Sequence, residues 1–442
     1  MSALADLLLQ GPQPASLLCQ RLGVSQATFS RLVNAEHNVI KAGQARATRY
    51  ALIRPVRQIR QFPLWQIDNE GRAWSFGDMY PVWPQGSCLV ILNNGAAQWF
   101  DGLPWYLTDL RPQGFLGRAW GRRLAQQAGL PEDIRLWQEE DVLLALSQQV
   151  PENLGGWLVG EESYRRWFEA PVPQAISESD KLTVYGDMAN SALAGDIVGS
   201  SAGGEQPKFT CYAQTEAGPA HLIVKFTSPL HNENSQRWAD LLHAEALALN
   251  ILNQAAITAS QAFVLVNQQR QVFLEVVRFD CTGTGGRLGI VSLEAVQCEF
   301  ASGPLHWPAA MAELLDSKII EATTLRLVQR IWAFGRLIAN SDMHAGNLSF
   351  FLSDMPLRLA PVYDMLPMAF APNSAGSMRR EPVAPQIDPI VPRDVWQEML
   401  PLARQFWLEA SQYRGISEGF RELSEKMARQ LDAVEVSILR LA

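Results

Sequence analysis

Two acids and an amide in the last quarter of the chain have the types and spacing that phosphoryl transfer requires. Asp342 and Asn347 stand five positions apart in the polar stretch 340–350, and Asp364 follows a later apolar run. One carboxylate can accept the proton of a hydroxyl nucleophile, while an amide oxygen and a second carboxylate can hold Mg²⁺. The three side chains are therefore the minimum set for a kinase site that uses ATP and magnesium.

An amphipathic helix must deliver this loop. Apolar residues recur there at i, i+4, i+7 and i+11, which predicts a buried helix face made by Leu327, Ile331, Phe334 and Ile338. We expect Asp342 to accept the proton, and Asn347 and Asp364 to hold the metal. His344 could position a phosphate, and a structural histidine that only hydrogen-bonds to the backbone is an equal alternative.

A loop of small residues precedes these groups. Residues 199–208 end in Lys208, and a strand-like run follows. Small residues let backbone N–H groups approach phosphate oxygens. The loop is not a Walker A motif, because no Gly-Lys-Ser/Thr leads into a helix, and glycine-rich hairpins are common. A second glycine-rich stretch, 282–289, is interpreted as a hairpin and not as a phosphate cradle.

A lysine and a glutamate add a second kinase feature. Lys225 ends the apolar run 220–226, and Glu245 follows about twenty residues later in a helical pattern. Most lysines at strand ends are only solvated, but a helix carboxylate that pairs with a strand lysine fixes the lysine for the α- and β-phosphates of ATP. Residues 271–280 are then expected to form a buried strand that runs into a hinge, whose backbone would bind the adenine edge.

The first sixty residues differ in charge from the rest. The chain has 442 residues with a net charge of −8, yet residues 1–60 carry eight Lys+Arg against two acids, so this part is +6 and the remainder −14. This asymmetry suggests a basic nucleic-acid module joined to an acidic body. Five scattered cysteines indicate neither a disulfide framework nor a zinc site, and no signal peptide or membrane-spanning run is evident, which predicts a cytoplasmic protein.

Helical spacing on both sides of Gly23 predicts a helix-turn-helix, with Ser25 as the cap of the second helix. Two short strands around Gly43 would form a wing. A helical hairpin used for packing or dimerisation is the alternative, but charge, turn and wing together favour DNA binding. The expected DNA contacts are Ser25, Gln26, Thr28, Ser30, Arg31, Lys41, Arg46 and Arg49.

These patterns divide the chain into four parts. They are a winged helix-turn-helix domain (1–60), a Trp-, Pro- and Gly-rich subdomain of strands followed by helices (61–180), a kinase N-lobe with phosphate loop and hinge (181–280), and a mainly helical C-lobe with the catalytic loop (281–442). The expected fold class is α+β, a bilobal protein-kinase-like fold behind an N-terminal winged helix.

The motifs together resemble the HipA-type serine/threonine kinases of bacterial toxin–antitoxin systems. The resemblance rests on residues 201–208, Lys225, residues 277–280, the Asp-x-His-Ala-x-Asn element at 342–347 and residues 363–364. It covers about residues 60–440 in consistent order. With the fused winged helix, the chain is similar to the YjjJ-type members.

The resemblance implies a role for each matched position. Asp342 matches the catalytic aspartate, Asn347 and Asp364 match the metal ligands, and Ser201 aligns with a serine that these kinases autophosphorylate. The implied cofactors are ATP and Mg²⁺. The ATP-binding set, to which we add Glu245 as the partner of the lysine, is Gly203, Gly204, Glu205, Gln206, Pro207, Lys208, Lys225, Val277, Arg278, Phe279, His344, Ala345, Gly346, Asn347, Tyr363 and Asp364.

Some features depart from the family pattern. Val277 stands where the hinge usually carries an acid, and Pro207 replaces an acid in the phosphate loop. Family kinases commonly bind a separate DNA-binding antitoxin, whereas a DNA module is built into this chain. The need for an antitoxin partner therefore stays open.

Three functions fit the residues. The first is a protein serine/threonine kinase that phosphorylates itself and a protein substrate, such as an aminoacyl-tRNA synthetase or another translation factor, and that binds DNA through its N-terminal domain. The second is a DNA-binding transcriptional regulator whose kinase fold only senses nucleotide. The third is a small-molecule kinase, because aminoglycoside-type kinases share an Asp-x-x-x-x-Asn loop; the small-residue loop at 202–208 argues against it.

Overall fold

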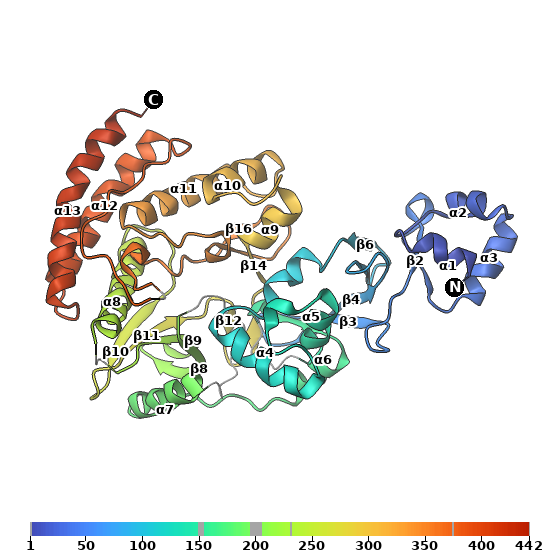
Figure 1. The fold of residues 1–442 in the computed structure, drawn as a ribbon, viewed down its shortest axis with the longest axis horizontal. Helices are drawn as coiled ribbons and strands as arrows, with labels where there is room; N and C mark the ends of the chain where they lie inside the picture. Colours follow the sequence, from blue (N-terminus) through green and yellow to red (C-terminus); the bar gives the residue numbers. More distant parts are fainter. Residues whose placement is uncertain (1, 149–153, 195–205, 230–231, 374, 442) are drawn as a thin grey trace.

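The N-terminal part of the computed structural model lies at one end of the molecule (Figure 1), and Ala42 and Ala51 pack there against Val82 and Leu89 of the next unit. The structure describes all residues except 1, 149–153, 195–205, 230–231, 374 and 442. Three helices come first, and strands β1 and β2 pair in antiparallel fashion after them. Their bounds are α1 (Ala3–Leu8), α2 (Ala15–Leu22), α3 (Gln26–Ala35), β1 (Val39–Ala42) and β2 (Arg49–Leu52).

Local signals set the turn between α2 and α3. Gly23 takes a left-handed conformation with φ of +64°, and its N–H donates to carbonyl oxygens in the last turn of α2. Ser25 then caps α3, because its hydroxyl accepts a hydrogen bond from the N–H of Thr28. Leu18, Phe29 and Tyr50 pack in one small core, which joins the helices to the strands.

A five-stranded antiparallel sheet forms the next unit, in the order β6-β5-β4-β3-β7. Its predicted strands-then-helices order is present, since helices α4 and α5 follow the first four strands and cover the sheet core. The elements are β3 (Phe62–Ile67), β4 (Ala73–Pro81), β5 (Cys88–Leu92), β6 (Ala97–Phe100), the short helix η2 (Trp105–Leu110), α4 (Gly114–Ala128), α5 (Glu139–Leu146), β7 (Trp157–Val159) and α6 (Glu161–Glu169).

A second sheet, in the order β10-β11-β9-β8, carries Lys225. Its antiparallel register places Lys208 of β8 opposite Lys225 of β9. Helix α7 packs against one face through Tyr185, and α8 packs against the other through Leu242. The elements are α7 (Lys181–Ala194), β8 (Lys208–Thr215), β9 (Gly218–Phe226), α8 (Glu233–Gln254), β10 (Ala262–Val266) and β11 (Val272–Val277).

Helices dominate the remainder of the chain, as predicted. The predicted helix face lies on α11, where Ile331 and Phe334 are fully buried and Leu327 is partly buried. The hairpin expected at 282–289 forms from β12 (Cys281–Thr282) and β13 (Gly286–Arg287). The other elements are β14 (Ile290–Ser292), α9 (Leu293–Phe300), α10 (Trp307–Asp316), α11 (Ala322–Leu337), η5 (Ala345–Asn347), β15 (Ser349–Phe351), β16 (Arg358–Leu359), η6 (Met368–Phe370), α12 (Arg393–Gln412) and α13 (Glu418–Leu439).

The largest hydrophobic core lies among these C-terminal helices and includes residues of α8, such as Leu241 and Leu252. Helix α8 therefore belongs to the cores on both sides of it, which joins the Lys225 sheet to the helical part. In the described part of the chain, no helix is long and apolar enough to cross a membrane.

His243 lies at this junction. Its side chain is 5% exposed, its ring centroid is 5.4 Å from that of Tyr413, and its Nδ1 has no hydrogen-bond partner among the described residues. Burial lowers the pKa of His243 from 6.5 to about 4. The unfolded chain therefore binds a proton near pH 6.5 that the folded protein resists until about pH 4.

The first prediction follows from the lowered pKa of His243. The stabilising effect of a neutral His243 is complete above about pH 6.5 and is lost as the pH falls towards 4, at a total cost of about 3 kcal/mol. His243→Leu should therefore flatten the dependence of unfolding free energy on pH in this window. Urea unfolding of both proteins between pH 7.5 and 4 measures it, and equal slopes would contradict the assignment.

Candidate active site

The end of α11 turns the chain sharply into the predicted catalytic loop. Ala339 takes a left-handed conformation with φ of +60°, and the N–H of Asn340 donates to the carbonyl of Gly335 at 2.8 Å. The side-chain oxygen of Asn340 then accepts a hydrogen bond from the N–H of Asp342 at 3.0 Å. These contacts fix the backbone from which the Asp342 carboxylate projects.

Further bonds hold the loop after Asp342. The Asn347 amide Nδ2 donates to the carbonyl of Asp342 at 2.7 Å, which closes the loop on itself. The Nδ1 of His344 accepts from the N–H of Gly346 at 3.1 Å, so His344 does brace the backbone. The Tyr363 hydroxyl donates to the carbonyl of Gly346 at 2.8 Å. The loop is thus preorganised by side chains bonded to its own backbone.

Asp342 is an exposed residue, although neighbouring protein atoms partly surround its carboxyl. Burial by the surrounding protein raises the pKa of its carboxyl above the ordinary value, while nearby His344 lowers it and Asp364 raises it. A higher pKa makes the carboxylate a better proton acceptor. The environment of Asp342 therefore suits the general-base role predicted for it.

A buried charge cluster lies behind the loop. Lys225 Nζ is 2.7 and 2.8 Å from the two carboxylate oxygens of Glu245 and also contacts Oδ1 of Asp364. The Lys225 and Glu245 side chains are only 6% and 1% exposed, against 25% for Asp364. The strand lysine, the helix glutamate and the later aspartate, far apart in the sequence, thus meet at one point. The pairing of Lys225 with Glu245 was expected, whereas the contact of Lys225 with Asp364 was not.

Charge and burial compete within this cluster. Burial alone would lower the pKa of Lys225, but the carboxylates of Asp364 and Glu245 raise it well above its ordinary range. Burial raises the pKa of Glu245, whereas Lys225 and Lys208 outweigh burial at Asp364 and lower its pKa. Asp364 therefore stays ionised, which is the form that a metal ligand requires.

The predicted phosphate loop is seen only at its end. Ser201, Gly203, Gly204 and Glu205 lie outside the described residues. Gln206 and Pro207 are partly buried, and the carbonyl of Pro207 accepts from the N–H of Phe226 at 3.1 Å. Lys208 is 3% exposed and close enough to influence Asp364 and Glu245 electrostatically. Two lysines thus face two carboxylates where the loop reaches the sheet.

The predicted hinge forms backbone hydrogen bonds and an ion pair within the protein that the sequence did not indicate. The N–H of Val277 donates to the carbonyl of Gln261, and that of Arg278 to the carbonyl of His221, both at 2.9 Å. The Arg278 guanidinium forms a buried ion pair with Asp280 at 2.7 Å. The expected adenine contacts would therefore use the other backbone groups of this stretch, and Arg278 is placed as a structural residue.

Phe279 and Tyr363 do come together. Their ring centroids are 5.8 Å apart, which joins the hinge to the strand before Asp364. Ala345 and Gly346 lie in the short helix η5 of the catalytic loop. The structure thus brings Lys225, Glu245 and Asp364 into contact, and Tyr363 links the loop at 342–347 to Phe279.

The sequence assigned no role to three residues that organise this site. Asn340 also donates through Nδ2 to the carbonyl of Asp364 at 3.3 Å, so it links both predicted acidic loops. The Trp307 indole donates to the carbonyl of His344 at 2.9 Å, and Ser349 bonds to the Tyr363 hydroxyl at 2.8 Å. A polar residue two positions before Asp342 was a signal for Asn340, whereas nothing in the sequence links Trp307 to the loop.

The donor atoms fit a magnesium ion that also binds phosphates. Because Nδ2 of Asn347 is occupied by a carbonyl, its oxygen is the atom available to a metal. Asp364 supplies an ionised carboxylate. No group of three His, Cys, Asp or Glu residues that could hold a metal occurs in the described part. One or two protein oxygens are typical of Mg²⁺ sites completed by substrate phosphates and water.

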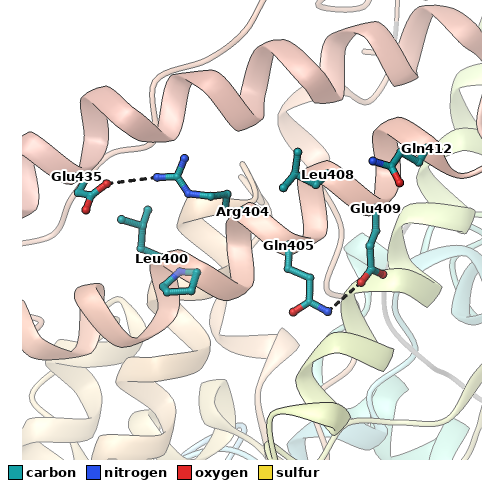
Figure 2. Close-up of a pocket in the computed structure, with 8 residues that line it drawn as sticks. Leu400, Arg404, Gln405, Leu408, Glu409, Gln412 and Glu435 are labelled. Atoms are coloured by element: carbon teal, nitrogen blue, oxygen red, sulfur yellow. Dashed lines mark hydrogen bonds and ion pairs between the residues drawn. The ribbon is translucent and has the colours of Figure 1, made fainter.

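A separate cavity of about 410 Å³ lies on α12 and α13 (Figure 2). Arg404 contacts Glu435 at 3.3 Å across it, and Gln405 donates to Glu409 at 2.8 Å. None of its lining residues belongs to the predicted site. It is a groove between two surface helices.

The residues predicted to contact DNA fall into two groups. Gln26, Arg31, Lys41 and Arg46 are exposed on α3 and on the strands and their connection. The Ser25 and Thr28 side chains bond to each other at 3.1 Å as part of the helix cap, and the Ser30 hydroxyl donates to the carbonyl of Gln26. Arg49 is exposed but donates to the carbonyl of Arg46 at 3.2 Å. Ser25, Thr28, Ser30 and Arg49 thus form hydrogen bonds within the domain.

Sequence comparison places the chain among known proteins. A family model described as the HipA-like C-terminal domain matches residues 200–433, and one described as the YjjJ-like toxin, middle domain, matches residues 58–168. Toxin YjjJ of Escherichia coli strain K12 is 57% identical over 441 residues, which cover 100% of both chains.

Structural comparison agrees in fold. A chain of the Shewanella oneidensis MR-1 complex of HipA, HipB and operator DNA matches with a TM-score of 0.50 and 13% identity, over 85% of this chain and 97% of that one. The Helicobacter pylori proinflammatory kinase CtkA matches more weakly, with a TM-score of 0.36 and 13% identity, over 53% of this chain and 92% of that one.

The chain therefore belongs to the HipA-like family, and its similarity to a YjjJ toxin extends over its whole length. The predicted family and the predicted mixed α and β fold of HipA type are confirmed.

The second prediction concerns the buried charges. Lys225→Met leaves the buried Glu245 carboxylate without its cation, so the free energy of unfolding should fall by about 3–5 kcal/mol. Lys225→Met combined with Glu245→Leu should recover at least half of this loss. Urea unfolding measures both proteins, and a double variant less stable than the single one would contradict this account.

Proposed function

We propose that this protein is an ATP-dependent serine/threonine protein kinase of the toxin type, with a built-in DNA-binding domain. The observation that carries the proposal is the meeting of Lys225, Glu245 and Asp364 behind a loop that is braced around Asp342 and Asn347. Each of these residues has the type and environment that its kinase role requires. The proposed domains are 1–60, 61–180, 181–280 and 281–442.

In the proposed mechanism, each of these side chains has a separate role. Asp342 accepts the proton of a substrate serine or threonine hydroxyl as the oxygen attacks the terminal phosphorus of ATP. The bond from that phosphorus to the oxygen of the β-phosphate breaks, and ADP leaves. Lys225, oriented by Glu245, binds the α- and β-phosphates, and Lys208 adds positive charge beside the phosphate loop. Asn347 and Asp364 would hold Mg²⁺, whose charge would stabilise the phosphates of ATP.

Autophosphorylation at Ser201 would then regulate the kinase. A phosphate on the phosphate-binding loop adds negative charge where ATP phosphates must bind, so it should repel ATP. The proposed protein substrate is a translation factor such as an aminoacyl-tRNA synthetase, in line with the family resemblance. The proposed setting is the cytoplasm, and the E. coli relative is itself named a toxin.

We propose either a separate antitoxin or residues 1–60 of this chain as the DNA-binding partner of the kinase part. The Shewanella structure is a complex of HipA with HipB and operator DNA. In this chain the basic residues 1–60 supply a DNA-binding face of their own, which makes a single-chain equivalent of such an assembly chemically reasonable.

The third prediction tests catalysis. Asp342→Asn removes the proton acceptor while keeping size and fold, so phosphate transfer from labelled ATP should fall on the order of 10²–10⁴-fold. Asp354→Asn is the matched control, because this exposed Asp lies outside the site. Phosphoproteomics after expression of wild type and Asp342→Asn would identify the target. Undiminished transfer by Asp342→Asn would remove Asp342 from the mechanism.

A DNA-binding regulator that only senses nucleotide is the second candidate, favoured by the +6 charge of residues 1–60. ATP binding without transfer, together with an ATP-dependent change in DNA affinity in gel shifts, would support it over the kinase.

The fourth prediction tests the DNA face under either function. Arg31→Ala, Lys41→Ala and Arg46→Ala should each weaken binding to DNA of mixed sequence, and each lost phosphate contact should reduce the slope of log K against log salt by about 0.9. Arg135→Ala, which removes an 85% exposed arginine from the middle unit, is the control. Binding that is equally strong in all four variants would locate the DNA contact elsewhere.

A further inference from the structure

A long irregular segment follows the Asp364 loop. Between η6 and α12, residues 371–392 contain no helix or strand wherever the structure describes them. Connections longer than roughly 12–15 residues without regular structure are uncommon in compact domains and are often functional. We call these residues the 371–392 segment.

One buried arginine holds this segment. Arg237 on α8 is 7% exposed, and its Nη1 donates to the carbonyls of Phe370 and Arg379, both at 3.0 Å. Its guanidinium lies 4.9 Å from the centre of the Phe420 ring. The nearest acid, Asp240, is 4.0 Å from Nε. The cation is thus stabilised mainly by backbone carbonyls and an aromatic face.

Burying a guanidinium is costly unless its donors are satisfied. Here Nη1 donates to one carbonyl at the end of η6, immediately before the irregular stretch, and to one within it. Such a contact gives the 371–392 segment a fixed place against α8. A surface pair also joins the two, between Arg380 and Glu233 at 2.5 Å, but both side chains are about 70% exposed and such pairs contribute little.

The same helix carries Glu245. Arg237 precedes Glu245 by eight positions, or about 12 Å along the helix axis. Asp240 adds a second anchor, since its carboxylate accepts from the N–H and hydroxyl of Ser417, the cap of α13, at 2.7 and 2.6 Å. A helix moves as a rigid rod, so these anchors set where Glu245 stands relative to Lys225.

We propose that Arg237 is a positioning residue that couples the 371–392 segment to the Lys225–Glu245 pair through α8. When the segment is docked on Arg237, α8 holds Glu245 against Lys225; when the contact is lost, α8 shifts and Lys225 loses its orientation towards the phosphates of ATP. This inference rests on the proposed kinase function, and its experiment separates the two.

The fifth prediction uses two replacements of Arg237. Arg237→Met keeps an unbranched side chain but removes the donors and the charge over Phe420, so it should lower kcat for phosphate transfer 10- to 100-fold and raise KM for ATP several-fold. Arg237→Lys keeps a buried cationic donor and should recover at least half of that loss on a logarithmic scale. Arg380→Ala, which breaks only the exposed pair of the same two elements, should stay within twofold of wild type.

A double-mutant cycle with Glu245→Gln tests whether the Arg237→Met substitution lowers activity through Glu245. If Arg237 acts through Glu245, the loss caused by Arg237→Met should shrink to less than threefold in the Glu245→Gln background. Full additivity of the two losses in kcat/KM would overturn the proposal, as would wild-type kinetics of Arg237→Met.

Amide hydrogen exchange reads the coupling without any activity. Arg237→Met should increase exchange both in residues 375–392 and in α8 around Glu245, and Arg380→Ala should not. If wild type transfers no phosphate but this exchange pattern appears, the proposed function fails and the coupling stands. If exchange rises only in the 371–392 segment while α8 is unchanged, the coupling is overturned.

Discussion

The buried contact of Lys225 with Glu245 and Asp364 is the constraint on which the rest of this structure depends. Removing charges from water is expensive, and the expense is offset only when the geometry of the pair is good. Three separate pieces of chain must therefore be held together: a strand, a helix and the loop after Val362. The sheet that contains β9, the long helix α8 and the C-terminal hydrophobic core hold these three side chains in contact with one another.

The loop at 340–347, the predicted catalytic loop, is held by hydrogen bonds and not by buried charge. Its side-chain positions are set by hydrogen bonds to backbone groups, from Asn340, Asn347, His344, Tyr363 and Trp307. Such bonds cost no reorganisation when a substrate arrives, so they preorganise the loop for electrostatic stabilisation. Asn340 links two loops, because its side-chain amide accepts from the N–H of Asp342 and donates to the carbonyl of Asp364.

Helix α8 connects the two systems. It takes part in the core beside the Lys225 sheet and in the large C-terminal core, and it carries both Glu245 and Arg237. A helix shared between two cores transmits displacement, because packed interiors deform little. The irregular segment is tied to that helix, because the carbonyl of Arg379 accepts a hydrogen bond from the buried Arg237 guanidinium.

The sequence by itself determined the order and chemistry of the site. Asp342, Asn347 and Asp364, the strand with Lys225 and the helix with Glu245 were all identifiable, because periodicity predicts elements and motif spacing predicts roles. It also predicted the helical turn at Gly23 and the hairpin near residue 285, since glycine marks both positions through its backbone freedom.

Only the tertiary structure decided which distant groups meet. Sequence could not show that the Arg278 side chain turns into a buried pair with Asp280, or that the hinge N–H groups bond to Gln261 and His221. It gave no sign that Trp307 reaches the carbonyl of His344 or that Arg237 reaches that of Arg379. The physical reason is that local propensity acts over a few residues, whereas the contacts of Trp307 and Arg237 join positions 37 and 142 residues apart and form only when whole elements pack.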